Sequence, residues 1–414
     1  LSNKRNADNI KPILLHPEGR SIPESFSNAS VSEKLIASSI IHLPLEQAVL
    51  PPSNAEPLSA EYIYDLRKSA SPENIKLLNK ALKKMRPHFW AFILISMPRT
   101  DGSRTQLLLR FSANSPLPHP LAEKSDAWKV DVFRLNQLDS EYLLERGGSD
   151  HSLQEKHVAV IGCGSVGGEI AYMLAKAGCG KLTLIDDEHL ESDNIYRHRL
   201  GGQHLNFKPN SNGHVISTFK VDALKKSLMM DLPYIDINAV AKSVNQKSKV
   251  VLPKGVDLVI VAVGSPSQNS IINRKLKKSG INSVIYCWNE AASIGGHAIA
   301  LDLNSSCYEC LHSQAGGLAA KTQLSLIEPG QAITKNLTGC AGVFTPFSYL
   351  DSVRTAEIAT QLAINFLIKK EHSIARSWKG MKSRSINTTE RYDKMAERDS
   401  LALSKSAYCG VCND

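Results

Sequence analysis

The segment 156–186 constrains the fold of this chain more than any other. It opens with the apolar run KHVAVIG, continues with the helical pattern SVGGEIAYMLAKAG, and closes with a second apolar run, KLTLID. Short apolar runs are typical of buried strands, and small residues on one face let a helix pack closely on a sheet. The segment therefore predicts a strand, a helix and a second strand parallel to the first.

The same alternation continues along the second half of the chain. Further strand patterns are DINAVAKSV, DLVIVAVG, INSVIYCW and HAIALDL, and helical patterns surround KVDALKKSLMM and SQNSIINRKLKKSG. A Gly-rich loop and the long amphipathic pattern LDSVRTAEIATQLAINFLIKK follow, before a polar tail that ends in CGVC. Alternating strands and helices form doubly wound α/β sheets whose strands are mostly parallel. We assign residues 149–414 to one such domain.

The N-terminal part has a different character. Its first stretch, residues 1–60, is rich in Pro, Ser and Asn and predicts a linker or irregular segment. Next, ENIKLLNKALKKM has a helical pattern, and WAFILISM and TQLLLRFSA flank the turn sequence PRTDGSR, which predicts a β-hairpin. Residues 61–148 are therefore expected to form a smaller α/β domain.

Composition limits the classes of partner. The net charge is +9, but the basic residues lie in scattered helical stretches such as RKLKKSG, which favours solvated helix faces over a nucleic-acid groove. We find no apolar run of about 18 residues, and the polar opening LSNKRNADNIKP lacks a signal-peptide core. We expect a cytoplasmic protein that contacts neither membrane nor nucleic acid directly. Because the chain begins with Leu, we also expect further residues before it.

A glycine motif at the first strand-to-helix turn predicts a nucleotide site. Gly162, Gly164 and Gly167 form G-x-G-x-x-G, and Asp186 ends the second strand. Glycines there let backbone amides and the positive helix end approach phosphates, while an acid at the end of the second strand can accept from ribose hydroxyls. The motif leaves ATP and a nicotinamide cofactor open, and glycines needed only for close packing are the structural alternative.

The residues after Asp186 favour a triphosphate. Asp187, Asn194 and Arg197 lie in one loop, and Lys220 begins the next helical pattern. Arg and Lys neutralise phosphate oxygens, and a carboxylate can hold Mg²⁺. Each of these side chains alone is ordinarily a solvated surface group, so the prediction of ATP with Mg²⁺ depends on their joint placement.

The cysteines predict a structural metal site. All eight lie at or after Cys163, and two Cys-x-x-Cys pairs stand out: Cys307 with Cys310, and Cys409 with Cys412. Two such pairs complete a closed tetrahedral Zn²⁺ site with no open position for catalysis. Two disulfides or free thiols are the alternatives, and a cytosolic chain disfavours the disulfides.

These motifs together resemble the ThiF and MoeB adenylyltransferases and the ubiquitin-activating enzymes. The resemblance spans about 156 to 412 through GCGSVG, IDDEHLESDNIYRH, Lys220, DLVIVAVGSP, CYEC with CGVC, and GCAGVFTP. It implies a Rossmann-like adenylation domain that uses ATP to adenylate the C-terminal glycine of a ubiquitin-like protein. Asp186 would bind the ribose, and Asn194, Lys220 and the catalytic Arg197 would contact the phosphates. Because such domains pair, a homodimer is expected, and residues 61–148 are a candidate degenerate adenylation-like half.

The sequence departs from the family pattern after the DLVIVAV strand. Many members carry an Asp there that is tied to Mg²⁺, whereas this chain has VGSPSQN. Asp187 is our candidate for that role, and weak or absent adenylation is the alternative. Arg146, in LERGG, resembles the segment that supplies an arginine finger.

Cys340, in TGCAGVFTP, is the candidate nucleophile. Cys163, Cys179 and Cys287 lie in strand and helix patterns, where free cysteines are usually buried packing residues. Cys340 instead follows a Gly-rich, Lys-bearing segment, and a thiol near basic groups can have a lowered pKa. Ubiquitin-activating members can place their thioester cysteine in this loop. We predict that Cys340 forms a thioester, with a buried packing cysteine as the alternative.

The segments SEYLLERGGSDHSLQEKHVAVIGCGSVG, NIYRHRLGG and GCAGVFTPFSYLDS most resemble activating enzymes of bacterial CBASS antiphage operons. This implies that the chain activates the C-terminal glycine of a cGAS-like nucleotidyltransferase and works with a ubiquitin-conjugating-type domain. Because that domain needs its own cysteine and none precedes Cys163, we expect it to be removed or supplied by a partner. The alternatives are a MoeB-like adenylyltransferase for a sulfur carrier without a thioester step, a non-reacting binding module, and a nicotinamide oxidoreductase.

Overall fold

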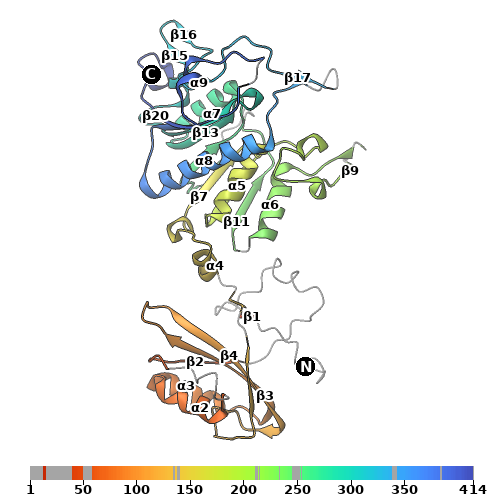
Figure 1. Ribbon diagram of the computed structural model, residues 1–414, viewed down its shortest axis with the longest axis vertical. Helices are drawn as coiled ribbons and strands as arrows, with labels where there is room; N and C mark the ends of the chain where they lie inside the picture. Colours follow the sequence, from red (N-terminus) through yellow and green to blue (C-terminus); the bar gives the residue numbers. More distant parts are fainter. Residues whose placement is uncertain are drawn as a thin grey trace. The chain divides into compact units, whose positions relative to one another are not determined.

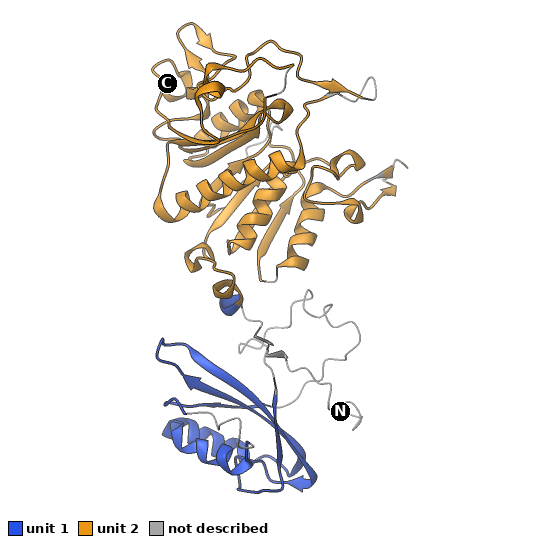
Figure 2. Ribbon diagram, viewed as in Figure 1, with its two compact units in different colours: residues 1–22, 30–142 blue, residues 23–29, 143–414 orange. Residues whose placement is uncertain are grey.

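The computed structural model forms two compact units, residues 1–22 with 30–142, and residues 23–29 with 143–414 (Figure 2). The described residues are 13–14, 40–49, 58–133, 136–137, 140–209, 213, 215–232, 234–244, 252, 254–337, 343–382 and 385–413.

The first unit is built on a four-stranded sheet with the order β2-β3-β4-β5. Its strands are β2 (Ile40–Pro44), β3 (His88–Pro98), β4 (Arg104–Leu117) and β5 (Lys129–Phe133). The helices α2 (Ala60–Asp65) and α3 (Pro72–Leu82) share a core cluster with the sheet (Figure 1). A two-residue strand, β1 (Ile13–Leu14), pairs with β6 (Asn136–Gln137). The predicted helix and β-hairpin are confirmed.

The structure differs in one respect from the expectation for residues 1–60. The stretch 1–60 is not only a linker, because β2 pairs with β3 and the side chains of Leu43 and Leu45 are buried. A strand of five residues between Pro- and Ser-rich flanks is too short to give a clear periodic signal. In this sheet β3, β4 and β5 are antiparallel, and β2 with β3 is the one parallel pair among its described strands; the degenerate adenylation-like half stays a prediction.

The second unit contains an eight-stranded sheet with the order β11-β8-β7-β12-β13-β14-β19-β20. The first five strands are parallel and the last three are antiparallel additions. Their bounds are β7 (His157–Ile161), β8 (Lys181–Ile185), β11 (Asp236–Val240), β12 (Leu258–Val261), β13 (Ser283–Asn289), β14 (Gly295–Asp302), β19 (Ile374–Lys379) and β20 (Arg398–Ala402). This arrangement confirms the predicted doubly wound, mostly parallel sheet.

Helices cover both faces of this sheet (Figure 1). One face packs against α5 (Ser165–Lys176), α6 (Lys220–Asp231) and α8 (Tyr349–Lys369), and the other against α7 (Pro266–Lys278). Because side chains alternate along a strand, Val158 and Val160 of β7 face the first core and Ala159 and Ile161 face the second. A strand buried on both faces has a continuous run of apolar residues. This is why β7 could be predicted from the sequence.

The winding direction of the sheet reverses between β7 and β12, at the carboxyl edge of the sheet. From β7 the chain proceeds through α5 to β8 on one side, and from β12 through α7 to β13 on the other, with the helices on opposite faces. Ligands of doubly wound sheets bind at such a reversal point. Separately, none of the helices in the described residues has the length and apolarity needed to span a membrane.

Candidate functional site

The glycine turn (residues 162–167) leads from β7 into α5 at this edge. Gly162 has a φ of +84°, and a Cβ there would lie 2.9 Å from the Ala262 carbonyl oxygen. A Cβ on Gly167 would overlap the carbonyl oxygen of Gly162, whereas the space beside Gly164, the N-cap of α5, is open. Two of the three glycines are thus required by backbone packing, and the third leaves the N-terminus of α5 accessible.

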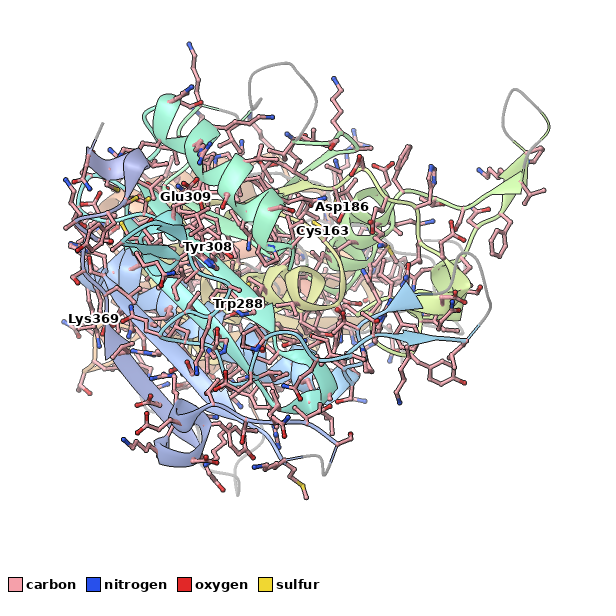
Figure 3. All side chains as sticks on the ribbon, turned by 90° about the horizontal axis from the view of Figure 1, so that it is seen from above. Cys163, Asp186, Trp288, Tyr308, Glu309 and Lys369 are labelled. Carbon is pink, nitrogen blue, oxygen red and sulfur yellow. The ribbon has the colours of Figure 1, made fainter. Side chains whose placement is uncertain are left out.

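Asp186, at the end of β8, holds the glycine turn in place. Its Oδ2 accepts a hydrogen bond from the backbone amide of Cys163 at 2.7 Å, and its Oδ1 accepts from the amide of Glu188 at 2.8 Å. Figure 3 shows Asp186 beside Cys163. Burial raises the pKa of Asp186, and the two backbone hydrogen bonds oppose that rise. Each carboxylate oxygen retains a further acceptor position.

Lys220 brings a buried cation to the same place. It is the first residue of α6, its side chain is only 7% exposed, and its Nζ pairs with the carboxylate of Glu188. Its charge is near enough to counter the increase in the pKa of Asp186. Because buried lysines are almost always paired, a ligand phosphate could take the place that the exposed Glu188 side chain now occupies.

The loop after β8 carries the remaining predicted polar residues. Asn194 ends a short helix, η4 (Ser192–Asn194), and its Oδ1 accepts from the amide of Glu191 at 3.0 Å. Arg197 is half-buried, with its guanidinium carbon 5.4 Å from the centroid of the Phe347 ring. Asp187 is exposed beside Asp186. The structure thus links Lys220 to Asp186 through Glu188, and it turns Arg197 toward the segment before α8.

His198 was missed by the sequence analysis. It is buried, its Nε2 lies 2.8 Å from the carbonyl oxygen of Cys163, and its Nδ1 accepts from the amide of Leu200 at 3.0 Å. Burial lowers the pKa of His198 to about 4. The only sequence signal was a histidine directly after Arg197, which does not distinguish a buried ring from an exposed one.

Cys340 lies outside the described residues. The strands on either side of it, β17 (Lys335–Asn336) and β18 (Val343–Phe344), pair in antiparallel fashion. The chain that follows is anchored to the site: the carbonyl oxygen of Pro346 accepts from the amide of Ala292 at 2.8 Å, and Phe347 stacks with Arg197. The contact of Phe347 connects the segment after Cys340 to the loop after β8, and that of Pro346 connects it to the short helix η6 (Ala291–Ser293).

Cys163, Cys179 and Cys287 are buried in the second unit. Burial raises the pKa of Cys179 to about 11 and that of Cys287 to about 12, and it raises the pKa of Cys163 as well. A thiol that stays protonated is a poor nucleophile. The expectation that these three residues are packing cysteines is consistent with their environment.

The four predicted zinc ligands meet, although the two pairs are nearly a hundred residues apart. Their Sγ atoms all lie within 4.8 Å of one another. The separations are 4.0 Å for Cys307 to Cys310, 3.6 Å for Cys307 to Cys409, and 3.8 Å for Cys310 to Cys412. Tetrahedral Zn–S bonds of about 2.3 Å imply sulfur separations of about 3.8 Å. The arrangement fits Zn²⁺ closely.

The cysteine cluster is tied to α7. Lys277 Nζ lies 3.5 Å from Cys412 Sγ and donates to the carbonyl oxygen of Val411 at 2.9 Å. Arg274 donates through Nε and a terminal nitrogen to the two carboxylate oxygens of Glu309, at 2.7 and 2.9 Å. Glu309, which stands between the first two cysteines in the sequence and is labelled in Figure 3, is buried. The cysteine cluster therefore ties the C-terminal tail to the helix that follows β12.

Arg146 does not join the nucleotide edge of its own chain. A Cβ on Gly178, just after α5, would lie 3.3 Å from the Leu144 side chain, and Ser149 Oγ lies 3.4 Å from the carbonyl oxygen of Lys176. The segment around Arg146 thus packs at the C-terminal end of α5, about 18 Å of helix away from the glycine turn. Any contact of Arg146 with phosphate would have to be made in a second copy.

Comparison with known proteins agrees with this geometry. The ThiF family model matches residues 140–396. The ATP-dependent ubiquitin transferase-like protein Cap2 of Pseudomonas aeruginosa (strain BWHPSA011 / Pa011) is 30% identical over 252 residues, which cover 59% of this chain and 42% of that protein. Ubiquitin-like modifier-activating enzyme 5 of Bombyx mori is 28% identical over 210 residues, 46% of this chain and 49% of that protein.

Among solved structures, a crystal structure of E. coli MccB with succinimide gives a TM-score of 0.45 at 16% identity, covering 66% of this chain and 71% of that one. The matched parts span less than half the length of the two curated relatives. The family match extends from α4 (Ser140–Arg146), before the glycine turn, to beyond α8, and covers more than half of the residues. The chain belongs to the ThiF family.

Proposed function

We propose that this chain uses ATP to adenylate the C-terminal glycine of a protein. The observation that carries the proposal is the link from Asp186 through Glu188 to Lys220 at the glycine turn, beside the open N-terminus of α5. Asp186 would accept from the ribose hydroxyls, and the turn amides with Asn194, Arg197 and Lys220 would bind the triphosphate. Mg²⁺ would reduce the charge of the triphosphate, with the exposed Asp187 as its candidate carboxylate ligand.

The adenylation step follows from these roles. A carboxylate oxygen of the glycine forms a bond to the α-phosphorus, the bond to the β-phosphate oxygen breaks, and pyrophosphate leaves with the electron pair. Negative charge increases on the phosphate oxygens during this exchange, and Arg197 and Lys220 would offset it. The product is an acyl adenylate.

In the second step, the Cys340 thiolate would attack the acyl carbon, and AMP would leave with the electron pair of the broken bond. The contact between Arg197 and Phe347 supports this step, because it joins the segment after Cys340 to the phosphate side of the site. The resulting thioester would be passed to a ubiquitin-conjugating-type domain.

The proposed setting is bacterial antiphage defence in the cytoplasm. Its support is the similarity to Cap2 proteins, together with the resemblance to CBASS activating enzymes. The activated partner would be a cGAS-like nucleotidyltransferase, and the active form a homodimer. The runner-up function is a MoeB-like adenylyltransferase that acts on a sulfur carrier without a thioester.

Replacing Cys340 by Ala separates these two functions. With ATP, Mg²⁺ and a cGAS-like nucleotidyltransferase that ends in glycine, we expect the unaltered chain to form an adduct on a non-reducing gel that dithiothreitol removes. The Cys340→Ala variant should form none, yet retain ATP–pyrophosphate exchange within about threefold, since adenylation precedes the thiol. An adduct that persists in the variant would overturn the assignment of Cys340. Exchange without any adduct from the unaltered chain would favour the MoeB-like function.

A further inference from the structure

His198 connects the loop after β8 to the glycine turn. It is 5% exposed, although its near neighbour Tyr196 is 91% exposed. Its Nδ1 must be the acceptor, because the Leu200 amide that faces it at 3.0 Å is a donor. The proton is therefore on Nε2, which donates to the carbonyl oxygen of Cys163 at 2.8 Å. The ring is a neutral donor with a defined tautomer.

The Cys163 backbone is consequently held on both sides. Its amide donates to Asp186 Oδ2 at 2.7 Å, and its carbonyl oxygen accepts from His198. Cys163 lies between Gly162, with a φ of +84°, and Gly164, the N-cap of α5. Because its carbonyl group shares a peptide plane with the Gly164 amide, the orientation of one sets the direction of the other. His198 thereby sets the direction in which the Gly164 amide points.

The surroundings of His198 suit this task. A Cβ on Gly168 would lie only 3.4 Å from the imidazole Cε1, so the ring packs against the first turn of α5. Burial is the main reason that the pKa of His198 is lowered to about 4, and the nearby charges of Lys220, His204 and Arg197 act in the same direction. A protonated ring would lose the Nδ1 acceptor for Leu200. The hydrogen bond from the Leu200 amide therefore requires the neutral ring that the lowered pKa also favours.

We infer that His198 is a positioning residue of the phosphate-binding turn, acting through the Cys163 carbonyl group and adjoining Arg197 in the chain. The inference rests on the proposed ATP site and deepens it. The donor at Nε2 holds the turn amides in the direction that accepts a triphosphate before ATP arrives. Without this hydrogen bond, ATP binding would have to order the turn, and the free-energy cost of that ordering would lower the affinity for ATP.

Two variants test the donor itself. In His198→Gln, the amide nitrogen can reach the position of Nε2, whereas in His198→Asn the shorter side chain cannot. We expect His198→Asn to raise the KM for ATP in pyrophosphate exchange about tenfold with kcat within about threefold, as the loss of one buried hydrogen bond predicts. His198→Gln should stay within about threefold of the unaltered chain in both the KM for ATP and kcat. His372→Asn, an exposed histidine, is the matched control.

The outcomes are distinguishable. Equal KM values for the Asn and Gln variants at equal melting temperature would overturn the role of the Nε2 donor. His198→Met fills a similar volume without a donor, so its KM for ATP should match that of His198→Asn. It replaces His198→Asn in the test if that variant does not fold. Calorimetric titration of ATP into the unaltered chain tests the ATP site separately. Absence of ATP binding there would overturn the proposed function. Normal ATP binding together with an unchanged KM in His198→Asn would overturn only this inference.

Discussion

The rate of ATP–pyrophosphate exchange is expected to fall about a hundredfold or more in the Lys220→Met variant. Removal of any other single charge in the site should lower the rate less. The Lys220 side chain is 7% exposed and lies near Asp186 at the turn. If its ammonium group is removed, water has little access to stabilise the phosphate charge in its place. Preorganised cations in such desolvated places are the strongest stabilisers of charge that develops during a reaction. Met retains the length and apolar stem of Lys, which limits the change to the ammonium group.

The matched control for Lys220→Met is Lys226→Met. Lys226 is exposed on the same helix, and its replacement should leave exchange within about threefold, because exposed charges are screened. The melting temperatures of both variants are measured alongside by calorimetry. Exchange near the unaltered level in a folded Lys220→Met chain would contradict the assignment of Lys220 to the phosphates.

The partner of Lys220 adds a second measurement. Glu188 pairs with Lys220 while its own side chain is 69% exposed. In Glu188→Gln, Lys220 would be free to approach a phosphate without displacing a carboxylate, so the KM for ATP should stay equal or fall. An increase of the KM comparable to that in Lys220→Met would instead indicate that Glu188 holds Lys220 in its active position.

Removal of the metal centre should cause the largest loss of stability. Metal binding contributes on the order of 10 kcal/mol in small zinc domains. Cys409 is fully buried within the four-cysteine cluster, and Cys409→Ser removes one of the four ligands. We expect a loss of at least about 4 kcal/mol, which corresponds to a fall in melting temperature of roughly 10 °C for a unit of this size. Zinc content, measured by mass spectrometry, should fall from about one ion per chain toward zero.

A buried cysteine outside the cluster provides the control. Cys287→Ala, on β13, should retain the zinc and lower the melting temperature much less, because it removes only one packed sulfur atom. The loss of zinc should also reduce nucleotide exchange, since Arg274 and Lys277 tie the cluster to α7, which begins next to the nucleotide edge. A Cys409→Ser chain with unchanged melting temperature would contradict a structural zinc centre.

Much of the second unit could be predicted because its signals are local. Strands buried on both faces leave continuous apolar runs, as in β7 and β12, and a sharp turn between β7 and α5 requires glycines within a few residues. The first unit was predicted less completely. Its strand β2 is recognisable only from its pairing with β3, which lies more than forty residues later in the chain.

The sequence by itself determined the strands and helices of the parallel part of the second unit's sheet, the glycine motif and the two cysteine pairs, since each depends on spacing along a few residues. Only the tertiary structure decided the contacts among them. It joined His198 and Asp186 to the two sides of Cys163, buried Lys220 against Glu188, and placed Arg146 at the far end of α5. Such contacts join residues from separate strands and helices, and they depend on strand order and helix placement, which no local pattern encodes.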